Sequence, residues 1–217
     1  LPGALSVIAI SEKNNLLNAP ETYMEKISTR VTEKNVIDLD YSVKKNIFNL
    51  SEYLNKKPEN LTACILERPR HNKIINELKD LKVKIKFISD GDVSGALLVT
   101  DEKYSVDIFL GTGGGPEGVL AATALDAFDC GFQGRFLFET DKDKQRAKEM
   151  GIDDLTKKYD LNEIIKGDSI FCATGITSGD LVPGVKIEED KFITETLVTH
   201  KHSSLKKVVK LNQKIIR

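Results

Sequence analysis

Residues 105–129 read SVDIFLGTGGGPEGVLAATALDAFD, an apolar run, a glycine-rich turn and a helical pattern in direct succession. SVDIFLG (105–111) is short, apolar and bounded by turn residues, which is typical of a buried strand. PEGVLAATALDAFD (116–129) predicts a helix, because proline is favoured at the first helical position. A strand that leads through a tight turn into a helix is a building unit of α/β proteins, so this stretch predicts that fold class.

The same alternation continues on both sides of this stretch. Further strands are predicted at LTACILE (61–67), VKIKFIS (83–89), FQGRFLF (132–138) and SIFCATG (169–175). Helices are predicted at RHNKIINELKDLK (70–82) and VSGALLV (93–99). Alternating strands and helices predict a sheet covered by helices on both faces. We therefore expect an α/β fold, a layered sandwich with a mixed β-sheet, in which residues 1–217 form a single domain.

Three regions depart from this alternation. Residues 4–27 resemble a β-hairpin that turns at residues 12–15, and residues 192–211 alternate as two strands across a turn at residues 203–204. Residues 141–168 are charged and are predicted to be helical. Two helix-start signals lie within that region, at Asp153 and Asp160.

The composition excludes several classes of protein. With 32 basic and 33 acidic residues the formal net charge is −1, so the chain lacks the basic field that nucleic-acid binding needs. Its longest apolar runs are far shorter than a membrane span, and no secretory signal is visible. The isolated cysteines Cys64, Cys130 and Cys172 indicate a reducing compartment. We expect a cytoplasmic protein without a nucleic-acid or membrane partner, and the sequence leaves a homo-oligomer open.

The beginning of the chain is unusual. The first residue is Leu1 rather than methionine, and ALSVIAI (4–10) reads as a core strand almost at once. A natural N-terminus rarely begins inside a core strand. We therefore expect this chain to be the C-terminal part of a longer protein, so that its fold is incomplete on the N-terminal side.

The glycine-rich turn allows more than one interpretation. It matches the dinucleotide-binding pattern G-x-G-x-x-G, and the glycines in register are Gly113, Gly115 and Gly118. Glu139 follows at a strand end, where an acidic residue would contact a ribose. However, Glu117 places a carboxylate where the helix dipole would attract a pyrophosphate. A dinucleotide-binding oxidoreductase stays an alternative, as does a structural turn in which Glu117 only complements the dipole.

A divalent metal ion would explain the position of Glu117. A carboxylate beside a phosphate site is favourable when it binds a metal that bridges to the phosphate. Phosphate hydrolysis uses such a metal to polarise the phosphoryl oxygens and to lower the pKa of the attacking water. Glu117 is thus a candidate metal ligand, although one carboxylate alone does not make a metal site.

Two polar segments follow other predicted strands. The arginines of RPRH (68–71) could clamp a phosphate, and the carboxylates of DGD (90–92) could bind a metal or sugar hydroxyls. Each segment alone could equally be a surface helix start or a capped turn. Because ligand sites in α/β folds gather at the carboxyl ends of strands, both segments and the glycine-rich turn are expected to share one site. Together they indicate a phosphorylated sugar or polyol and a divalent metal.

These segments resemble the class II fructose-1,6-bisphosphatases of bacteria. The matching stretches occur in the family's order across nearly the whole chain: LNAPETYMEK (17–26), ILERPRH (65–71), SDGDVSGAL (89–97), GTGGGPEGVLAA (111–122), GRFLF (134–138) and ATGITSGDLVPGV (173–185). The resemblance implies an α/β sandwich fold shared with metal-dependent, lithium-sensitive sugar and inositol phosphatases. It also implies hydrolysis of the 1-phosphate of fructose 1,6-bisphosphate to fructose 6-phosphate with Mn²⁺ or Mg²⁺, a step of gluconeogenesis.

The resemblance also implies particular site residues. The implied substrate-binding residues are Tyr23, Arg68, Pro69, Arg70, Asp90, Gly91, Asp92 and Gly114, and the implied metal ligand is Glu117. The arginines would hold the phosphate that is not cleaved, and the Asp-Gly-Asp turn would face the sugar hydroxyls. We assign no catalytic residue in this chain.

The chain departs from the family in one respect. The family carries most of its metal carboxylates in an N-terminal half that this sequence lacks. We therefore expect the chain alone to bind a sugar bisphosphate weakly and to hydrolyse it slowly or not at all. A non-catalytic sugar-phosphate-binding remnant is a further alternative. The sequence does not decide between Mn²⁺ and Mg²⁺, or whether sedoheptulose bisphosphate or inositol phosphates are accepted. Missing sheet partners should leave apolar surface exposed and the protein poorly soluble.

Overall fold

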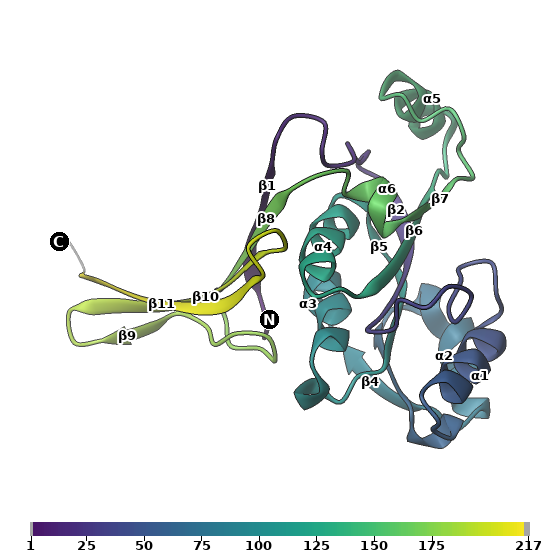
Figure 1. Cartoon of the computed structure of the whole chain (residues 1–217), viewed down its shortest axis with the longest axis horizontal. Helices are drawn as coiled ribbons and strands as arrows, with labels where there is room; N and C mark the ends of the chain where they lie inside the picture. Colours follow the sequence, from purple (N-terminus) through teal and green to yellow (C-terminus); the bar gives the residue numbers. More distant parts are fainter. Residues whose placement is uncertain (1, 215–217) are drawn as a thin grey trace.

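The computed structural model describes residues 2–214 and places the strands in two β-sheets that alternate with helices (Figure 1). Across the molecule the layers are a pair of helices, a larger sheet, a second pair of helices and a smaller sheet. In the described residues, no helix is long and apolar enough to cross a membrane. The layered α/β architecture agrees with the fold class predicted from the sequence.

The larger sheet is mixed. In spatial order its strands are β4 (Lys84–Ile88), β3 (Thr62–Leu66), β5 (Ile108–Gly114), β2 (Tyr23–Thr29), β6 (Gly131–Leu137) and β7 (Lys158–Asp160). β3 runs parallel to both β4 and β5, whereas the other neighbours are antiparallel. Parallel neighbours need crossover connections, and helices supply them here. The strands predicted between residues 61 and 138 are confirmed.

The smaller sheet is antiparallel. In order its strands are β1 (Leu5–Ser11), β8 (Ser169–Gly175), β10 (Lys191–His200) and β11 (Leu205–Lys214), and β9 (Lys186–Glu188) pairs with β10. The predicted strand pair at residues 192–211 is confirmed as the β10–β11 hairpin. The hairpin predicted at residues 4–27 is wrong, because β1 pairs with β8 while β2 pairs with β5 and β6. Local alternation identifies strands but cannot identify partners that lie far away in the sequence.

Four helices form the helical layers. α1 (Val43–Tyr53) and α2 (Asn72–Asp80) cover one face of the larger sheet, and α3 (Asp92–Leu97) and α4 (Gly115–Ala127) lie between the sheets (Figure 1). The side chain of Ser42 caps α1 by accepting a hydrogen bond from the Lys45 N–H at 3.2 Å. α1 is not predicted from the sequence, because its buried face includes the polar Asn46 and Ser51, which weaken the apolar periodicity.

The charged region 141–168 is only partly helical. It contains α5 (Asp141–Glu149) and the short α6 (Leu161–Ile164), separated by β7. The helix start predicted at Asp160 is confirmed by a capping box with Glu163. The start predicted at Asp153 is wrong. The neighbouring Asp154 accepts hydrogen bonds from the Thr156 N–H and hydroxyl at 2.9 and 2.7 Å, and this local turn replaces a helix.

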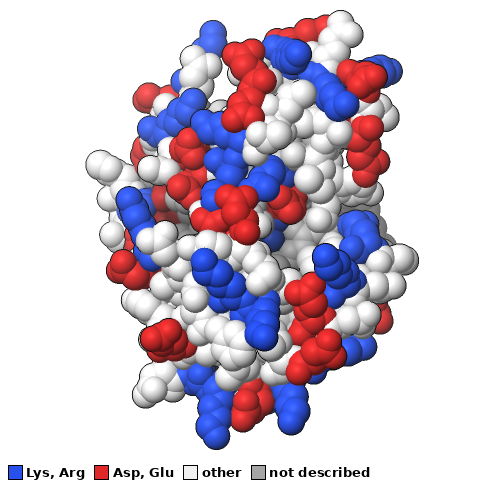
Figure 2. Space-filling view, turned by 90° about the vertical axis from the view of Figure 1, so that its right-hand side faces the viewer, with Lys and Arg blue, Asp and Glu red and all other residues white. Residues whose placement is uncertain are grey.

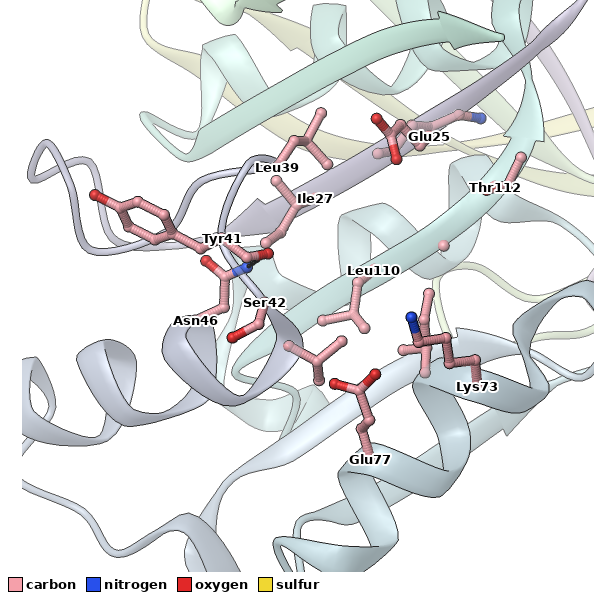
Figure 3. Close-up of a pocket in the computed structure, with 14 residues that line it drawn as sticks. Glu25, Ile27, Leu39, Tyr41, Ser42, Asn46, Lys73, Glu77, Leu110 and Thr112 are labelled. Carbon is pink, nitrogen blue, oxygen red and sulfur yellow. Dashed lines mark hydrogen bonds between the residues drawn. The ribbon is translucent and has the colours of Figure 1, made fainter.

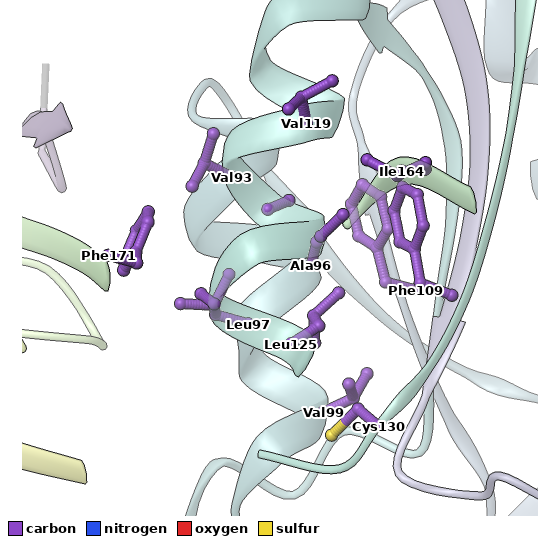
Figure 4. Packing of buried hydrophobic residues seen from close by; sticks show 14 of the residues in the cluster. Val93, Ala96, Leu97, Val99, Phe109, Val119, Leu125, Cys130, Ile164 and Phe171 are labelled. Carbon is purple, nitrogen blue, oxygen red and sulfur yellow. The ribbon is translucent and has the colours of Figure 1, made fainter. Parts of the chain in front are cut away.

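Two apolar cores lie on the two faces of the larger sheet. The core between the sheets includes Val93, Ala96, Leu97, Val99, Phe109, Val119, Leu125, Cys130, Ile164 and Phe171 (Figure 4). α4 is buried around most of its circumference, because a sheet packs on either side of it. The second core packs α1 and α2 against the opposite face through Ile47, Leu50, Ile75, Leu78 and Ile65.

The side of the smaller sheet that faces away from α4, called here the outer face, carries exposed apolar side chains. By the strand register it includes Ile8, Ile10, Ile170, Val209 and Leu211. Ile8 and Ile10 keep 53% and 51% of their surface exposed, and no helix of the described residues covers them. The predicted exposure of apolar surface is therefore confirmed for this sheet.

Candidate active site

The carboxyl ends of β3, β4 and β5 meet at one edge of the larger sheet, because these strands are parallel. Residues 68–70 follow β3, residues 90–92 follow β4, and the glycine-rich turn ends β5. Arg68 Nη2 lies 4.0 Å from Asp90 Oδ1, and contacts described below join the other segments. The structure thus brings the three predicted segments together, and we call this edge the candidate site.

Arg70 joins the arginine segment to the glycine-rich turn. Its Nε and Nη2 donate to the Thr112 carbonyl oxygen at 3.0 and 2.8 Å. Its guanidinium carbon lies 4.9 Å from the centre of the Tyr23 ring, a cation–π arrangement. Tyr23 is the first residue of β2 and pairs with Gly114 of β5. Pro69 is the first residue of a short 3₁₀ helix that also contains Arg70. Arg70 and Tyr23 are both exposed, so both can reach a ligand.

His71 holds the arginine segment against the end of β5. Its Nε2 accepts a hydrogen bond from the Thr112 N–H at 2.8 Å, so its Nδ1 carries the proton and donates to the Leu66 carbonyl at 2.7 Å. Burial lowers the pKa of His71 below its ordinary value of 6.5, which keeps the imidazole neutral. His71 thereby ties the end of β3 to the end of β5, a role that the sequence analysis did not identify.

The two aspartates of the Asp-Gly-Asp turn have different surroundings. Asp90 is exposed and accepts a hydrogen bond from the Gly91 N–H at 2.9 Å. Gly91 has a φ of +81°, a left-handed conformation that glycine adopts without strain. Asp92 is the first residue of α3, and its buried carboxylate pairs with Lys26. Asp90 is therefore open to a ligand, whereas Asp92 is held by the protein and does not cap α3, because Gly91 occupies the N-cap position.

Lys26 is a residue of this edge that the sequence analysis missed. It lies within β2 and is only 1% exposed. Its ammonium pairs with Asp92 and donates to the Gly114 carbonyl at 2.7 Å. Burial lowers the pKa of Lys26, and the carboxylates of Asp92 and Glu117 oppose that decrease. A lysine at an inward-facing strand position, two residues after Met24, was the available sequence signal.

The glycines of the dinucleotide-like pattern make room for protein side chains. A Cβ on Gly113 would lie 2.1 Å from Asp92 Oδ2, and a Cβ on Gly118 would lie 2.4 Å from Met24 Sδ. A Cβ on Gly115 would lie 2.8 Å from Cε1 of the Phe136 ring. Close packing thus closes all three positions to a side chain. The glycine spacing follows from these neighbours and needs no bound dinucleotide.

The strand order differs from that of a dinucleotide-binding domain as well. In that fold the glycine-rich turn follows a strand of a parallel sheet. Here β5 has the parallel β3 on one side and the antiparallel β2 on the other. Glu139 follows β6, which is separated from β5 by β2. The structure gives the oxidoreductase alternative no support.

Glu117 lies in the first turn of α4, where the helix dipole favours negative charge. The residue is exposed, and its Oε2 would stand 1.9 Å from a Cβ on Gly114, so the carboxylate folds back over the turn. Within residues 2–214, no group of three or more His, Cys, Asp or Glu side chains could hold a metal ion. The described residues therefore offer Glu117 as a candidate ligand but do not complete a metal site.

The candidate site carries charged side chains of both signs. Over the face of the molecule seen in Figure 2, basic and acidic side chains are mixed in the same way. At the candidate site, Lys26 and Asp92 neutralise each other inside the protein. Of the charged residues predicted for the site, Arg68, Arg70, Asp90 and Glu117 are partly or fully exposed and can reach a ligand. This set can bind an anion with the guanidinium groups and a cation or hydroxyl groups with the carboxylates.

A pocket of about 360 Å³ adjoins the candidate site between α1, α2, β2 and β5 (Figure 3), and Lys26 and Thr112 belong to the lining of this pocket as well. Its polar lining includes Glu25, Tyr41, Asn46, Lys73, Glu77 and Thr112. Burial raises the pKa of Glu25. In the described part of the chain, none of the predicted site residues lines this pocket. The predicted residues therefore gather along the sheet edge and not inside this cavity.

A layered α/β fold with arginines, carboxylates and glycines at one sheet edge is consistent with a sugar-phosphatase-like protein. The model of the family described as bacterial fructose-1,6-bisphosphatase, glpX-encoded, matches residues 1–213. The chain belongs to this family. The resemblance inferred from the sequence motifs is thereby confirmed.

Similar curated proteins carry the name D-fructose 1,6-bisphosphatase class 2/sedoheptulose 1,7-bisphosphatase. The relative from Synechococcus sp. (strain JA-3-3Ab) is 35% identical over 214 residues, covering 93% of this chain and 62% of the relative. The relative from Trichodesmium erythraeum (strain IMS101) is 33% identical over 220 residues, 95% of this chain and 64% of the relative. The relative from Trichormus variabilis (strain ATCC 29413 / PCC 7937) is 34% identical over 221 residues, which cover 96% of this chain and 64% of the relative. The chain thus spans 62–64% of the length of these relatives.

Proposed function

We propose that this chain supplies the substrate-binding edge of a metal-dependent sugar bisphosphatase. The reaction is hydrolysis of the 1-phosphate of fructose 1,6-bisphosphate to fructose 6-phosphate and phosphate. The observation that carries the proposal is the meeting of residues 68–70, 90–92 and 114–117 at one sheet edge, in a chain that belongs to this family. The names of the relatives support this substrate and a sedoheptulose bisphosphate as a second one.

The exposed side chains divide into separate tasks. Arg68 and Arg70 bind the phosphate that is not cleaved, because guanidinium groups match the geometry of phosphate oxygens. Asp90 accepts hydrogen bonds from sugar hydroxyls, and Tyr23 packs beside the substrate next to Arg70. Gly114 has no side chain, so the Glu117 carboxylate can fold over the turn and meet a substrate there. Asp92 contributes through Lys26 and the turn geometry instead of contacting the sugar directly.

Glu117 supplies one ligand to a divalent metal. The family is metal-dependent in general, and Mn²⁺ and Mg²⁺ are both suited to carboxylate oxygen ligands. When bound, the metal polarises the scissile phosphate and activates the attacking water. No hydrolytic step is assigned to the side chains of this chain, because its described residues do not complete a metal site. A single domain, a cytoplasmic location and the absence of a nucleic-acid partner stay predictions.

Phosphate release tests the proposal. The 217-residue chain, and the same chain extended by any residues encoded upstream of Leu1, are incubated with fructose 1,6-bisphosphate and Mn²⁺. We expect turnover by the extended protein and slow or no turnover by the chain alone. In the extended protein, Glu117→Gln should lower kcat by ~100-fold or more, because the metal loses a ligand.

Matched controls separate the alternatives. Glu59→Gln changes an exposed glutamate in the 3₁₀ helix at residues 58–60 and should leave turnover unchanged. Binding of the sugar bisphosphate that needs Mn²⁺ but gives no turnover in the extended protein would establish the non-catalytic remnant instead. NADH binding that needs no metal would favour the oxidoreductase. Enzyme-like turnover by the 217-residue chain would contradict its expected lack of activity.

A further inference from the structure

Two backbone groups of Thr112 are bound by side chains instead of by a neighbouring strand. In the described residues β3 pairs with β5 only through Ala63 and Cys64, so on that side no strand reaches Thr112. The Thr112 N–H donates to His71 Nε2 at 2.8 Å, and the Thr112 carbonyl oxygen accepts from Arg70 Nε and Nη2 at 3.0 and 2.8 Å. The side chains of residues 70 and 71 thus take the place of a strand beside the end of β5.

The imidazole of His71 is fixed on both sides. The residue is 1% exposed, and its Nδ1 donates to the Leu66 carbonyl at 2.7 Å while its Nε2 accepts from Thr112. A Cβ on Gly111 would lie 3.2 Å from Cε1 and from Nε2 of the ring, so this glycine makes room for the imidazole. One ring nitrogen is a donor and the other an acceptor, and only the neutral imidazole provides both.

Arg70 depends on Thr112 for its orientation. A guanidinium group has five N–H donors, and two of those of Arg70 bind the Thr112 carbonyl. Its guanidinium carbon also lies 4.9 Å from the centre of the Tyr23 ring. Three donors remain that can bind a phosphate. The position of Thr112 therefore sets the direction in which Arg70 presents these donors to a ligand.

Protonation of His71 is incompatible with these contacts. Both nitrogens of an imidazolium are donors, so a proton on Nε2 would face the Thr112 N–H and their hydrogen bond would be lost. Burial lowers the pKa of His71 below its ordinary value of 6.5, and the positive charges of Arg70 and Arg68 lower it as well. The imidazole is therefore neutral near pH 7 and becomes charged only as the pH falls through the lowered pKa.

The charges around His71 favour its neutral form. Its neighbours on β3 and β5 are backbone groups and a glycine, without a titratable side chain. Within residues 2–214, no carboxylate forms an ion pair with His71. The α2 side chains Lys73 and Glu77 line the pocket beside the site. The charged side chains of its own segment and of the start of α2 are Arg68, Arg70, Lys73 and Glu77.

We propose that His71 is a positioning residue for the sugar bisphosphate: through Thr112 it holds Arg70 in the orientation that binds the phosphate, and protonation of the imidazole ends this positioning. The proposal rests on the proposed function, in which Arg70 binds the phosphate that is not cleaved. The affinity for that phosphate is then complete above pH 6.5 and decreases as the pH falls through the lowered pKa of His71. His71 thus makes binding at the candidate site sensitive to pH.

NMR of the ligand-free chain tests the positioning itself. The ¹⁵N-labelled 217-residue chain is titrated from above pH 7 to below pH 6, and the signals of the His71 ring, the Thr112 amide and the Arg70 Nε–H are followed. We expect all three to change with one midpoint below 6.5, because protonation breaks the contacts of Thr112. Thr112 and Arg70 signals that do not follow the His71 ring would overturn the proposal.

Binding of sulfate tests the consequence for an anion. Sulfate keeps its charge in this pH range, whereas a phosphate group changes its charge at about pH 6. The affinity for sulfate should decrease by ~5-fold as His71 becomes protonated, because Arg70 is no longer oriented. Attraction between an imidazolium and the anion has the opposite sign. A constant or increasing affinity as the pH falls would therefore overturn the proposal.

Two substitutions separate positioning from a general effect of pH. His71→Gln offers a donor and an acceptor but cannot be protonated, so its sulfate affinity should not decrease at low pH. Arg70→Lys keeps the charge but loses the paired hydrogen bonds to Thr112, so it should bind sulfate ~5-fold more weakly above pH 7 and without the decrease. A decrease that persists in His71→Gln, or undiminished in Arg70→Lys, would overturn the proposal.

The matched control is a histidine that also uses both ring nitrogens. His200 Nδ1 lies 2.7 Å from Ser203 Oγ, and its Nε2 lies 2.7 Å from Asp168 Oδ2, at the smaller sheet. His200→Gln should leave the pH dependence of sulfate binding and of the Arg70 signal unchanged. Loss of the pH dependence in His200→Gln would assign it to the wrong histidine and overturn the proposal.

Circular dichroism accompanies each measurement, and the NMR titration of the unsubstituted chain needs no variant to fold. Failure of both sulfate and fructose 1,6-bisphosphate to bind at any pH would refute the proposed function. The NMR titration decides in either case whether His71 controls the contacts of Thr112 and Arg70. We expect the three signals to share one midpoint, and separate midpoints would overturn the proposal.

Discussion

The two sheets differ in how completely they are covered. The six-stranded sheet has helices on both faces, and β3 within it is almost wholly buried. The five-stranded sheet packs on α4 with one side and exposes apolar side chains on its outer face. The candidate site lies on the covered sheet. The site edge is therefore supported from both sides, and this support allows Lys26 and His71 to be buried beneath it.

The largest expected effect is a difference in the free energy of unfolding that is lost when one isoleucine of each sheet is replaced by alanine. Ile65 is fully buried in β3, and Ile10 is 51% exposed in β1. Ile65→Ala should lower the free energy of unfolding by ~2–5 kcal/mol, because it leaves a cavity in a close-packed core. Ile10→Ala should cost less than ~1 kcal/mol, because its side chain is already half in water. Urea unfolding measures both values, and equal losses would contradict the difference in coverage.

A smaller effect concerns the pH dependence of the covered sheet. The pKa of His71 is lowered in the folded protein, so below 6.5 the unfolded chain binds more protons than the folded one. The stability that depends on neutral His71 is complete above pH 6.5 and is lost as the pH falls through the lowered pKa. The loss amounts to ~1.4 kcal/mol for each unit by which the pKa is lowered.

His71→Gln isolates this contribution. Urea unfolding of the parent and of the variant is compared at several pH values from above 7 to below 6. The variant starts less stable, but its free energy of unfolding should fall less steeply below pH 6.5 than that of the parent. Parallel curves for the two proteins would show that His71 does not titrate as the structure requires.

The smallest expected effect concerns the outer face of the five-stranded sheet. Replacing Ile8 and Ile10 together by threonine keeps β-branched side chains and removes apolar surface. The free energy of unfolding should change by less than ~1 kcal/mol, while binding of an apolar fluorescent dye should decrease. A loss of several kcal/mol would show that this face is covered in solution.

The sequence was sufficient for the strands whose apolar pattern is local. β3, β4, β5, β6 and β8 were predicted from short apolar runs, and their helical connections placed residues 68–70 and 90–92 at one edge. It was insufficient where a partner lies far away in the chain. The strand β1 pairs with β8, and no local pattern in residues 4–27 contains that information.

The same limit applied to the candidate site. Lys26 and Asp92 are separated by 66 residues, and His71 and Thr112 by 41, so their contacts exist only after the larger sheet has formed. The exposed residues of the site belong to motifs and could be predicted. The contacts of the buried Lys26 and His71 could not be predicted, because their partners Asp92 and Thr112 lie far away in the chain.

The central claim is that the edge formed by β3, β4 and β5 binds a sugar bisphosphate, and NMR titration tests it most directly. Fructose 1,6-bisphosphate is added to the ¹⁵N-labelled 24.1 kDa chain in the presence of Mg²⁺, and amide shifts are followed residue by residue. We expect shifts that gather at residues 68–71, 90–92 and 111–117 and that are lost in Arg70→Gln. Shifts that gather elsewhere, or no shifts at this edge at millimolar ligand, would contradict it.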